Sequence, residues 1–465
     1  MPTSYDVLII GSGQAGNPLA VALAEAGRKV VLVEENHLGG SCINYGCSPT
    51  KALLASAERA HQLRTAADYG IAATEPQVDF RAVIARKDAI IKKSRAGVRS
   101  NLTQEHEGIT VLHGHAAFTG PRAVRVALAG GETEELRVPL VFINTGTRAA
   151  VPELAGLQDV PYLTTTELLD LQELPEHLLI LGGGYIGLEF GQMFRRFGSR
   201  VTIIESNKNL LEHEDADVCQ AMQELLEAEG IEFVLGAEAH HVSRNAEGVL
   251  TLSARTKAGE RRLRGTHLLV ATGRVPNSDK LGLDTIGVKT DEKGYIQVNS
   301  RLETAAKGVY ALGDVHGGPQ FTHISYDDYR VVRDGIVHRK WRSAKQRPLP
   351  YTVFTDPQLG RIGLSEDQAR EQGIDYRVAT MPVRTIGRAR ETGRTLGFWK
   401  VLVDGQDRVL GAAILGPEGG EIMMMFQLVM MGKLKYPQLR NMVIAHPTWA
   451  EGLNNVFTKL QKPNG

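Results

Sequence analysis

Short apolar runs that stop at glycine-rich turns occur twice along this chain, and each is followed by a helical pattern. The first run, residues 5–10 (YDVLII), enters the turn GSGQAG at residues 11–16, and helical periodicity then covers residues 17–26. Another apolar run, residues 29–33, ends on Glu34. Unbroken apolar runs of this length are typical of parallel strands buried on both faces. The pattern predicts a strand, a turn, a helix and a second strand.

The same pattern returns in the middle of the chain. Residues 178–181 (LLIL) lead into GGGYIG at residues 182–187, a helix is expected over residues 188–197, and a strand over residues 200–204 ends on Glu205. Alternating strands and helices of this kind favour an α/β fold with a parallel sheet. The sequence therefore predicts two Rossmann-like, three-layer domains.

Both turns have the glycine spacing that binds the pyrophosphate of a dinucleotide. Gly11 permits the tight turn, Gly13 lets the phosphates approach the backbone, and Gly16 lets helix and strand pack closely. The N-terminus of the following helix then faces the phosphates. The corresponding candidates in the second turn are Gly182, Gly184, Ile186 and Gly187.

An acidic residue ends the second strand of each unit. Glu34 follows Gly16 by 18 residues, where a carboxylate can accept hydrogen bonds from an adenosine ribose. Glu205 occupies the same place in the second unit, where an acid binds a free 2′-hydroxyl and repels a 2′-phosphate. We therefore expect NADH rather than NADPH, although Arg200 and Lys208 lie close enough in sequence to weaken that preference.

Two dinucleotides in one chain suggest that electrons pass between them. One dinucleotide should be a nicotinamide that delivers hydride. The other must accept two electrons and pass them on, which is the chemistry of a flavin such as FAD.

Composition indicates the partners and the cellular location to expect. The chain has 465 residues, which predicts several domains, and its 53 basic and 53 acidic side chains give no net charge. We therefore expect no nucleic-acid or membrane partner. Three cysteines do not make a disulfide scaffold, and the first residues do not resemble a signal peptide. A cytoplasmic protein is expected.

Cys42 and Cys47 are five residues apart, and three uses are open to them: a metal site, a structural disulfide or redox chemistry. A structural zinc site needs four ligands, and Cys219, the third cysteine, lies about 170 residues away on a helical pattern. A disulfide across so short a loop would add little stability. Redox chemistry is favoured, with Cys219 as a buried structural residue and no metal site.

A disulfide between these two cysteines also constrains the backbone. Five residues of ideal helix rise about 7.5 Å, whereas the Cα atoms of bonded cysteines lie within about 7 Å. Residues 42–47 are therefore not expected to form one regular helix, and Gly46 and Pro49 stand where a distorted first turn needs them. The helical pattern that follows places the pair at a helix N-terminus, which lowers the pKa of a thiol.

Five segments together resemble the class I pyridine nucleotide-disulfide oxidoreductases, a family that includes dihydrolipoyl dehydrogenase, glutathione reductase and mercuric reductase. These segments are GGSCINYGCSPTK (39–51), INTGT (143–147), ATGR (271–274), GVYALGD (308–314) and HPTWAE (446–451). The resemblance covers essentially the whole chain.

The resemblance implies four regions and a dimer. An FAD-binding domain is expected over residues 1–148, an NAD(P)-binding domain over 149–273, a central domain that completes the FAD site over 274–345, and an α+β interface domain over 346–465. The interface domain of this family builds a homodimer.

The resemblance also implies roles for individual residues. Cys42 would be the thiol that exchanges with substrate, and Cys47 the thiol beside the flavin. Lys51 would lie near the flavin, paired with Glu189, where a cation stabilises negative charge on the reduced ring.

A histidine and an acid near the C-terminus complete the implied catalytic set. His446 would reach across the dimer to Cys42 of the other subunit as acid and base, oriented by Glu451. The remaining residues implied to hold the cofactors are Gly40, Ser41, His115, Ala116, Thr145, Gly146, Gly273, Arg274, Gly313 and Asp314.

The electron acceptor stays open between a small-molecule disulfide and a metal ion. Glutathione reductase is disfavoured by Glu205, and mercuric reductase by the lack of vicinal cysteines near the C-terminus and by the presence of His446. Dihydrolipoyl dehydrogenase is compatible with these residues, but Tyr45 and Ser48 depart from its usual motif. These departures resemble mercuric-reductase-like or reactive-chlorine-resistance flavoproteins, which are proposed to reduce copper or uncertain disulfides.

Two further alternatives remain. The methionines among residues 423–431 could form a soft-metal surface, although at helical spacing they favour a dimer-interface core. The chain could instead be a diaphorase or NADH oxidase, or a flavin redox sensor with little turnover.

Overall fold

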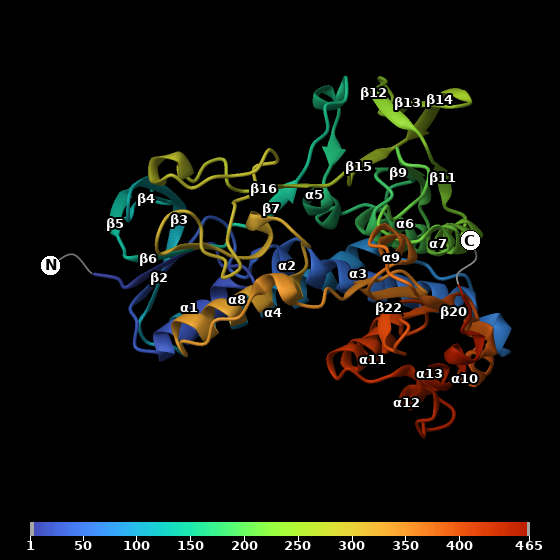
Figure 1. The fold of residues 1–465 in the computed structure, drawn as a ribbon. Coiled ribbons are helices and arrows are strands. Elements are labelled where there is room, and N and C mark those ends of the chain that lie inside the picture. The colour runs from blue at the N-terminus through green and yellow to red at the C-terminus, as the bar shows by residue number, and fades with distance from the viewer. Residues whose placement is uncertain (1–3, 463–465) are drawn as a thin grey trace.

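The computed structural model describes residues 4–462, whose three main sheets are one mixed, one parallel and one antiparallel, with a smaller antiparallel sheet and a two-stranded ribbon besides (Figure 1). The first sheet lies at the left of the view among blue, cyan and yellow segments, the second at the upper right in green, and the third at the lower right in orange and red. Long helices run between these parts of the molecule.

The first sheet contains both strands of the first predicted unit. Its strands, in spatial order, are β17 (Val309–Ala311), β6 (Leu140–Ile143), β1 (Val7–Ile10), β2 (Val30–Glu34), β3 (Ile109–Gly120), β4 (Ala123–Leu128) and β5 (Thr133–Arg137). The pairs from β17 to β3 are parallel, and β3, β4 and β5 form an antiparallel meander. β17 comes from the segment expected to form a central domain, and it extends this sheet.

Three layers build this part of the core. Val7 and Ile9 of β1 pack toward helices α1 (Gly16–Glu25) and α8 (Thr322–Ile336), whereas Leu8 and Ile10 pack toward the meander. All four side chains are buried, as the unbroken apolar run requires.

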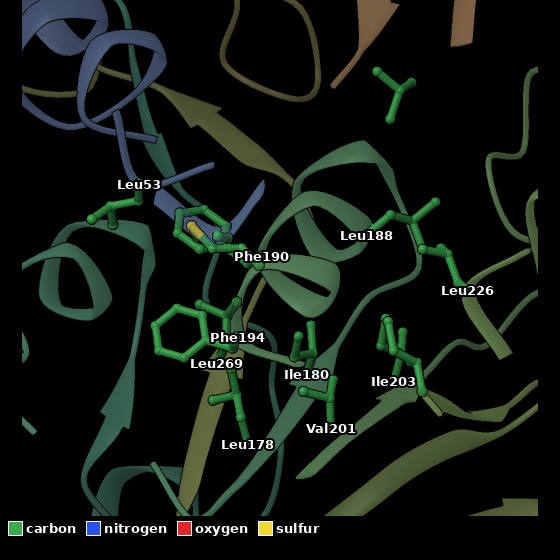
Figure 2. Packing of buried hydrophobic residues seen from close by; sticks show 14 of the residues in the cluster. Leu53, Leu178, Ile180, Leu188, Phe190, Phe194, Val201, Ile203, Leu226 and Leu269 are labelled. Atoms are coloured by element: carbon green, nitrogen blue, oxygen red, sulfur yellow. The ribbon is translucent and has the colours of Figure 1, made fainter. Parts of the chain in front are cut away.

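The second sheet repeats the arrangement with parallel strands throughout. Its strands, in spatial order, are β11 (Glu232–Val234), β10 (Arg200–Ile204), β9 (His177–Leu181), β15 (His267–Val270) and β8 (Tyr162–Leu163). Figure 2 shows Phe190 and Phe194 of helix α6 (Tyr185–Phe197) above this sheet, with Leu53 of α3 (Cys47–Arg64) beside them. Leu53, which comes from the helix that follows the cysteines, is therefore part of the core of the second unit.

An antiparallel sheet covers the other face of the second sheet. Its strands are β12 (Glu238–Arg244), β13 (Leu250–Thr256) and β14 (Gly259–Gly265). The chain crosses between the two units through a ribbon of β7 (Thr147–Ala149) and β16 (Arg274–Pro276), which are antiparallel. The ribbon begins at the INTGT and ATGR segments, as expected for crossing points.

The C-terminal part is a mixed α and β unit. Its antiparallel sheet has the order β18 (Tyr351–Val353), β19 (Gln358–Gly363), β22 (Val409–Gly416), β21 (Phe398–Val403) and β20 (Arg377–Pro382). Helix α11 (Gly419–Met431) packs on it and buries Met423 and Phe426. The predicted fold class, two Rossmann-like units plus an α+β unit, is confirmed.

The remaining helices connect and cover these sheets. They are α2 (Gly40–Asn44), α4 (Phe80–Thr103), α5 (Thr165–Leu169), α7 (Ala216–Ala228), α9 (Glu366–Glu371), α10 (Gly387–Glu391), α12 (Tyr436–Arg440) and α13 (Gly452–Asn455), with 3₁₀ turns η1 (Ala66–Tyr69), η2 (Leu157–Asp159), η3 (Leu283–Ile286), η4 (Gly313–His316), η5 (Ala344–Gln346), η6 (Val383–Thr385), η7 (Trp449–Glu451) and η8 (Val456–Lys459). Within residues 4–462, none of the helices has both the length and the apolar character needed to cross a membrane.

Candidate active site

The first glycine turn lies against the end of β6. Gly11 has a φ of +98°, and a Cβ there would lie 2.4 Å from the carbonyl oxygen of Asn144. A Cβ on Gly13 would lie 2.6 Å from Oδ1 of Asn144, and one on Gly16 would lie 2.4 Å from the carbonyl oxygen of Gly11. The Asn144 side chain also accepts a hydrogen bond from the Gly16 N–H at 2.9 Å. Glycine is therefore needed here for the backbone to pack, and α1 begins at this turn.

The second glycine turn is built in the same way and leaves open space before α6. Gly182 has a φ of +115°, and a Cβ there would lie 2.4 Å from the carbonyl oxygen of Ala271. A Cβ on Gly187 would lie 2.1 Å from the carbonyl oxygen of Gly182. By contrast, a Cβ on Gly184, directly before α6, would meet no described atom within 4 Å. The helix N-terminus is thus accessible to an anionic ligand.

The two acids occupy equivalent positions. Glu34 accepts a hydrogen bond from the Ser12 N–H at 2.8 Å, and Glu205 accepts one from the Gly183 N–H at 2.6 Å. Each carboxylate is therefore fixed to the middle of its glycine turn, where it can also meet a ribose.

The basic residues near Glu205 differ in their reach. Arg200 begins β10 and lies five residues, or about 16 Å of extended chain, from Glu205; it donates a hydrogen bond to Glu232 at 3.2 Å. The expectation that Arg200 weakens a preference for NADH is therefore wrong. Lys208 remains near Glu205 in the loop after β10.

Four of the residues implied to hold the flavin come together near the ends of β6 and β17. The hydroxyl of Thr147 donates to Asp314 at 3.2 Å, and Arg274 Nε donates to the same hydroxyl at 2.7 Å. Burial raises the pKa of Asp314. Thr145 and Gly146 directly precede Thr147, and each bonds to the backbone of Asn277.

One pocket of about 1800 Å³ collects most of the implied cofactor residues. Those lining it are Gly11, Gly13, Glu34, Gly40, Ser41, Lys51, His115, Ala116, Thr145, Gly146, Ile186, Arg274 and Asp314, together with Cys42, Cys47 and Glu189. Gly16, Gly182, Gly184, Gly187, Glu205, Gly273 and Gly313 are not among its lining residues. The glycines, the acid at the strand end and the volume of the pocket fit a dinucleotide such as FAD.

The segment between the two cysteines breaks the helix, as the spacing predicts. Helix α2 ends at Asn44 and α3 begins at Cys47, with Tyr45 and Gly46 between them. Gly46 has φ −135° and ψ −113°, and a Cβ there would lie 3.1 Å from the carbonyl oxygen of Ser41. The expectation that residues 42–47 are not one regular helix is confirmed.

The Asn44 side chain fixes this loop. Its amide nitrogen donates to the carbonyl oxygens of Gly40 at 2.8 Å and Leu38 at 3.1 Å, and its amide oxygen accepts from Arg95 of α4. A buried amide with its hydrogen bonds satisfied on both atoms holds the backbone in one arrangement. The two cysteines are thus held in fixed positions relative to each other.

The two thiols have opposite acidities. Both cysteines are unbonded in this structure. The hydrogen bond from Cys42 lowers the pKa of Cys47 to about 6, and the Thr322 hydroxyl and the Lys51 cation act in the same direction. The same hydrogen bond and burial raise the pKa of Cys42. At neutral pH the pair therefore consists of a Cys47 thiolate and a Cys42 thiol.

Lys51 and Glu189 form the predicted ion pair. Lys51 lies on α3 and Glu189 on α6, and the Glu189 side chain is 5% exposed. The other oxygen of Glu189 accepts from the Phe354 N–H at 2.9 Å, and the Lys51 ammonium lies 4.2 Å from the centre of the Phe354 ring. The cation is thus fixed on the side of the pocket near Cys47.

His446 and Glu451 also form a pair, but away from the cysteines of the same chain. His446 Nδ1 lies 2.9 Å from Glu451 Oε1, and the His446 side chain is 72% exposed. This hydrogen bond raises the pKa of His446. Among residues 4–462, those lining the pocket of Cys42 do not include His446 or Glu451.

Cys219 lies in a different environment. It is buried on α7, and burial raises its pKa to about 12. In the described part of the chain, three or more histidine, cysteine or acidic side chains do not come together as metal ligands.

Sequence reasoning missed three residues of the site. Asn144 bridges the first glycine turn to β6, Thr322 contacts Cys47, and Phe354 contacts both members of the Lys51 pair. The first stands inside the quoted INTGT segment and could have been found there. The other two are separated from the cysteines by roughly 270 to 310 residues, so only the fold reveals them.

Two family models match the chain. One, described as pyridine nucleotide-disulphide oxidoreductase, matches residues 5–328. The other, described as the dimerisation domain of the pyridine nucleotide-disulphide oxidoreductases, matches residues 349–457.

Several relatives are similar over nearly their full lengths. The probable pyridine nucleotide-disulfide oxidoreductase RclA of Escherichia coli (strain K12) is 39% identical, with 98% of this chain and 99% of RclA covered. A mercuric reductase of Streptomyces lividans is 37% identical (97% and 95% covered), and a dihydrolipoyl dehydrogenase of Thermus scotoductus is 35% identical (99% and 98% covered). The solved Cu(II) complex of the HOCl-induced flavoprotein disulfide reductase RclA from Escherichia coli matches with a TM-score of 0.89 at 38% identity, covering 98% and 99%.

Proposed function

This chain belongs to the pyridine nucleotide-disulphide oxidoreductases, and on that premise we propose that it passes electrons from NADH through Cys42 and Cys47 to Cu(II). It is a flavoprotein oxidoreductase that uses FAD and NAD(P)H. The contact between the thiols of Cys42 and Cys47, which lowers the pKa of Cys47 to about 6, carries the proposal.

The cofactor sites are assigned from the two glycine turns. Gly11, Gly13 and Glu34 would hold the adenosine diphosphate part of FAD, with Asp314 on its other part. When bound, FAD accepts a hydride from NADH and supplies two electrons to a disulfide. NADH would bind at the second turn, and Glu205 makes NADH the preferred nucleotide.

The cysteine pair changes oxidation state in each turnover. When the Cys42–Cys47 bond takes up two electrons and one proton, it opens to a Cys42 thiol and a Cys47 thiolate. The reduced pair then gives one electron to each of two Cu(II) ions, which become Cu(I), and the S–S bond forms again as the Cys42 proton is released. Cys42 would be the sulfur that meets the acceptor.

Cu(II) is chosen because of one relative. RclA shares 39% of its residues with this chain over almost its whole length, and a solved structure of RclA is a Cu(II) complex. Thiolates favour Cu(I), the product of the proposed reduction.

A disulfide such as lipoamide is the second candidate, and the His446–Glu451 pair favours it. Reduction of a disulfide acceptor gives thiols that must gain protons, and a histidine held by a carboxylate is suited to donate one to the leaving thiolate. Reduction of a metal ion adds no proton to the acceptor. The dihydrolipoyl dehydrogenase relative is consistent with this second candidate.

A homodimer would bring this pair to the cysteines. The outer face of α11 and the following loop expose large apolar side chains on one region of the C-terminal unit: Met424, Leu428, Met431 and Leu434. Exposed apolar patches of this kind mark interaction sites. We assign residues 346–465 as the interface domain, so that His446 of one subunit approaches Cys42 of the other. A cytoplasmic location suits a thiol pair that must be kept reducible.

The test is a panel of acceptors assayed by NADH oxidation. Cu(II), lipoamide, glutathione disulfide, Hg(II), a quinone and oxygen are compared in the wild type, in Cys42→Ser and in the control Cys219→Ser. We expect Cu(II) reduction to be lost only in Cys42→Ser. Electron transfer that is confined to quinone or oxygen and survives Cys42→Ser would instead identify a diaphorase or oxidase.

A further inference from the structure

The loop after β10 joins the second glycine turn to the C-terminal sheet. It begins at Glu205, which is bonded to the Gly183 N–H. The Leu211 N–H then donates to the carbonyl oxygen of Gly183 at 3.3 Å. A Cβ on Gly183 would lie 2.7 Å from the Leu210 side chain, so the loop is packed directly against the turn.

The other end of the loop is anchored by Glu214. Its side chain is 2% exposed, although it comes from a loop, and one oxygen accepts a hydrogen bond from the Tyr351 hydroxyl of β18. The other oxygen lies 3.9 Å from Nε of Arg361 on β19, which is 3% exposed. Asp215, the next residue, lies 3.2 Å from the Lys400 ammonium of β21. Three strands of the C-terminal sheet therefore hold one end of this loop.

Between the two anchored ends the backbone is strained. Leu211 has a φ of +51°, which a non-glycine residue rarely adopts and which costs conformational energy. Such a conformation persists only when surrounding contacts enforce it. Here the contacts are Gly183 on one side and Glu214, whose N–H donates to the Leu211 carbonyl oxygen at 2.8 Å, on the other.

We propose that Tyr351 and Glu214 are positioning residues that fix this loop, and through it Glu205 and the Gly183 backbone, for binding the adenosine half of the nicotinamide nucleotide. The inference rests on the proposed assignment of NADH to the second glycine turn. The pair acts through the loop and not by contact with the nucleotide. The pair holds the loop in one conformation before the nucleotide binds. Less conformational entropy is then lost on binding, which strengthens affinity.

The Tyr351 ring can be kept while its hydrogen bond is removed. The ring stacks on Phe321 with centroids 5.6 Å apart and planes 7° apart. Tyr351→Phe retains this stacking and loses only the hydroxyl, which donates a hydrogen bond to Glu214. Tyr69→Phe is the matched control, because the Tyr69 hydroxyl donates to the Thr392 carbonyl oxygen at 2.6 Å, in a different part of the molecule.

The test is calorimetric binding of ADP-ribose, which lacks the nicotinamide, to the oxidised holoenzyme. We expect Tyr351→Phe to weaken binding about fivefold, the effect of losing roughly 1 kcal/mol, and Tyr69→Phe to bind as the wild type does. Turnover with reduced nicotinamide mononucleotide, which lacks the adenosine, should be unchanged in both variants. Equal ADP-ribose binding in wild type and Tyr351→Phe, or an equal loss with the mononucleotide, would overturn the proposal.

A second pair of variants keeps the result interpretable. Glu214→Gln preserves shape and removes the charge, and it should weaken ADP-ribose binding in the same direction if Tyr351→Phe does not fold. Glu205→Ala tests the underlying site. If Glu205→Ala weakens ADP-ribose binding while Tyr351→Phe and Glu214→Gln do not, only the positioning role of Tyr351 and Glu214 is refuted. If Glu205→Ala has no effect, the assignment of the nucleotide site fails as well.

Discussion

The hydroxyl oxygen of Thr322 lies 3.1 Å from the sulfur of Cys47, although the two residues are 275 positions apart in the chain. Thr322 is the first residue of α8, whose N-terminus carries partial positive charge. A hydroxyl donor and a helix N-terminus on the same sulfur both favour the thiolate. This contact is made by the first unit, because α8 packs there, and not by the second unit or the C-terminal sheet.

Removing this hydroxyl should make Cys47 less acidic. Thr322→Val deletes a hydrogen bond to a charged sulfur, worth about 1.5–3 kcal/mol, so the pKa of Cys47 should rise from about 6 by about one to two units. A pH titration of thiolate absorbance in the reduced enzyme measures this shift. Thr322→Ser, which keeps the hydroxyl, should titrate like the wild type, and an unshifted Thr322→Val would show that the contact is not a donor to the thiolate.

Breaking the ion pair between Lys51 and Glu189 should have two separable effects, one on the free energy of unfolding and one on the pKa of Cys47. Lys51→Met leaves a buried Glu189 charge without its partner, which costs about 3–5 kcal/mol. It also removes a cation that lowers the pKa of Cys47. Chemical unfolding and the thiolate titration follow the two effects.

The double variant provides the control for this prediction. Lys51→Met with Glu189→Gln removes the unpaired buried charge, so most of the unfolding free energy should return while the pKa of Cys47 stays high. Recovery of both the free energy of unfolding and the low pKa of Cys47 would mean that the lysine acts only through Glu189.

Much of this arrangement could be predicted from local sequence, and the reason is physical. Gly16 and Gly187 are needed because a Cβ on each would collide with the carbonyl oxygen of the first glycine of its own turn, so their spacing alone identifies them. The break at Gly46 follows from the length of a disulfide and the rise of a helix. These features depend on neighbours in sequence.

The missed features depend on packing between distant segments. Thr322 reaches Cys47 because α8 docks beside α1, and Phe354 reaches Lys51 because β18 docks against α6. Arg200 was misjudged because closeness in sequence is not closeness in space along a strand. Residues on one strand five positions apart are separated by about 16 Å.

His446 should distinguish the two classes of acceptor. His446→Gln removes the base, so oxidation of dihydrolipoamide should fall at least 100-fold, whereas NADH-driven Cu(II) reduction should change little. Steady-state rates with the two substrates give the comparison. Equal losses with both would show that the histidine supports the fold or the cysteine pair rather than a thiol substrate.

The His446–Glu451 hydrogen bond should also set a pH dependence. It raises the pKa of His446 above that of an ordinary histidine. The neutral imidazole that acts as the base is present only above this raised pKa, so activity is lost as the pH falls through it. Glu451→Gln should lower the pKa and move the acid limb of dihydrolipoamide oxidation to lower pH. An unmoved limb would assign it to another group.

The dimer should be testable by complementation. Mixing Cys42→Ser with His446→Gln subunits gives heterodimers in which one site has both an intact Cys42 and an intact partner histidine. Dihydrolipoamide oxidation should therefore reappear in the mixture at about a quarter of the wild-type rate for random pairing. Failure to complement would contradict a shared site.

Leu428→Glu places a charge on the apolar face of α11, so this variant should be monomeric when its mass is measured by light scattering.

Anaerobic titration with NADH, with thiols counted at each step, tests the central claim most directly. If Cys42 and Cys47 form the redox pair, one NADH per subunit should produce two new reactive thiols and a long-wavelength absorbance from the Cys47 thiolate beside the flavin, and Cys219→Ser should behave identically. Bleaching of the flavin by the first NADH, without new thiols or the long-wavelength band, would contradict the account.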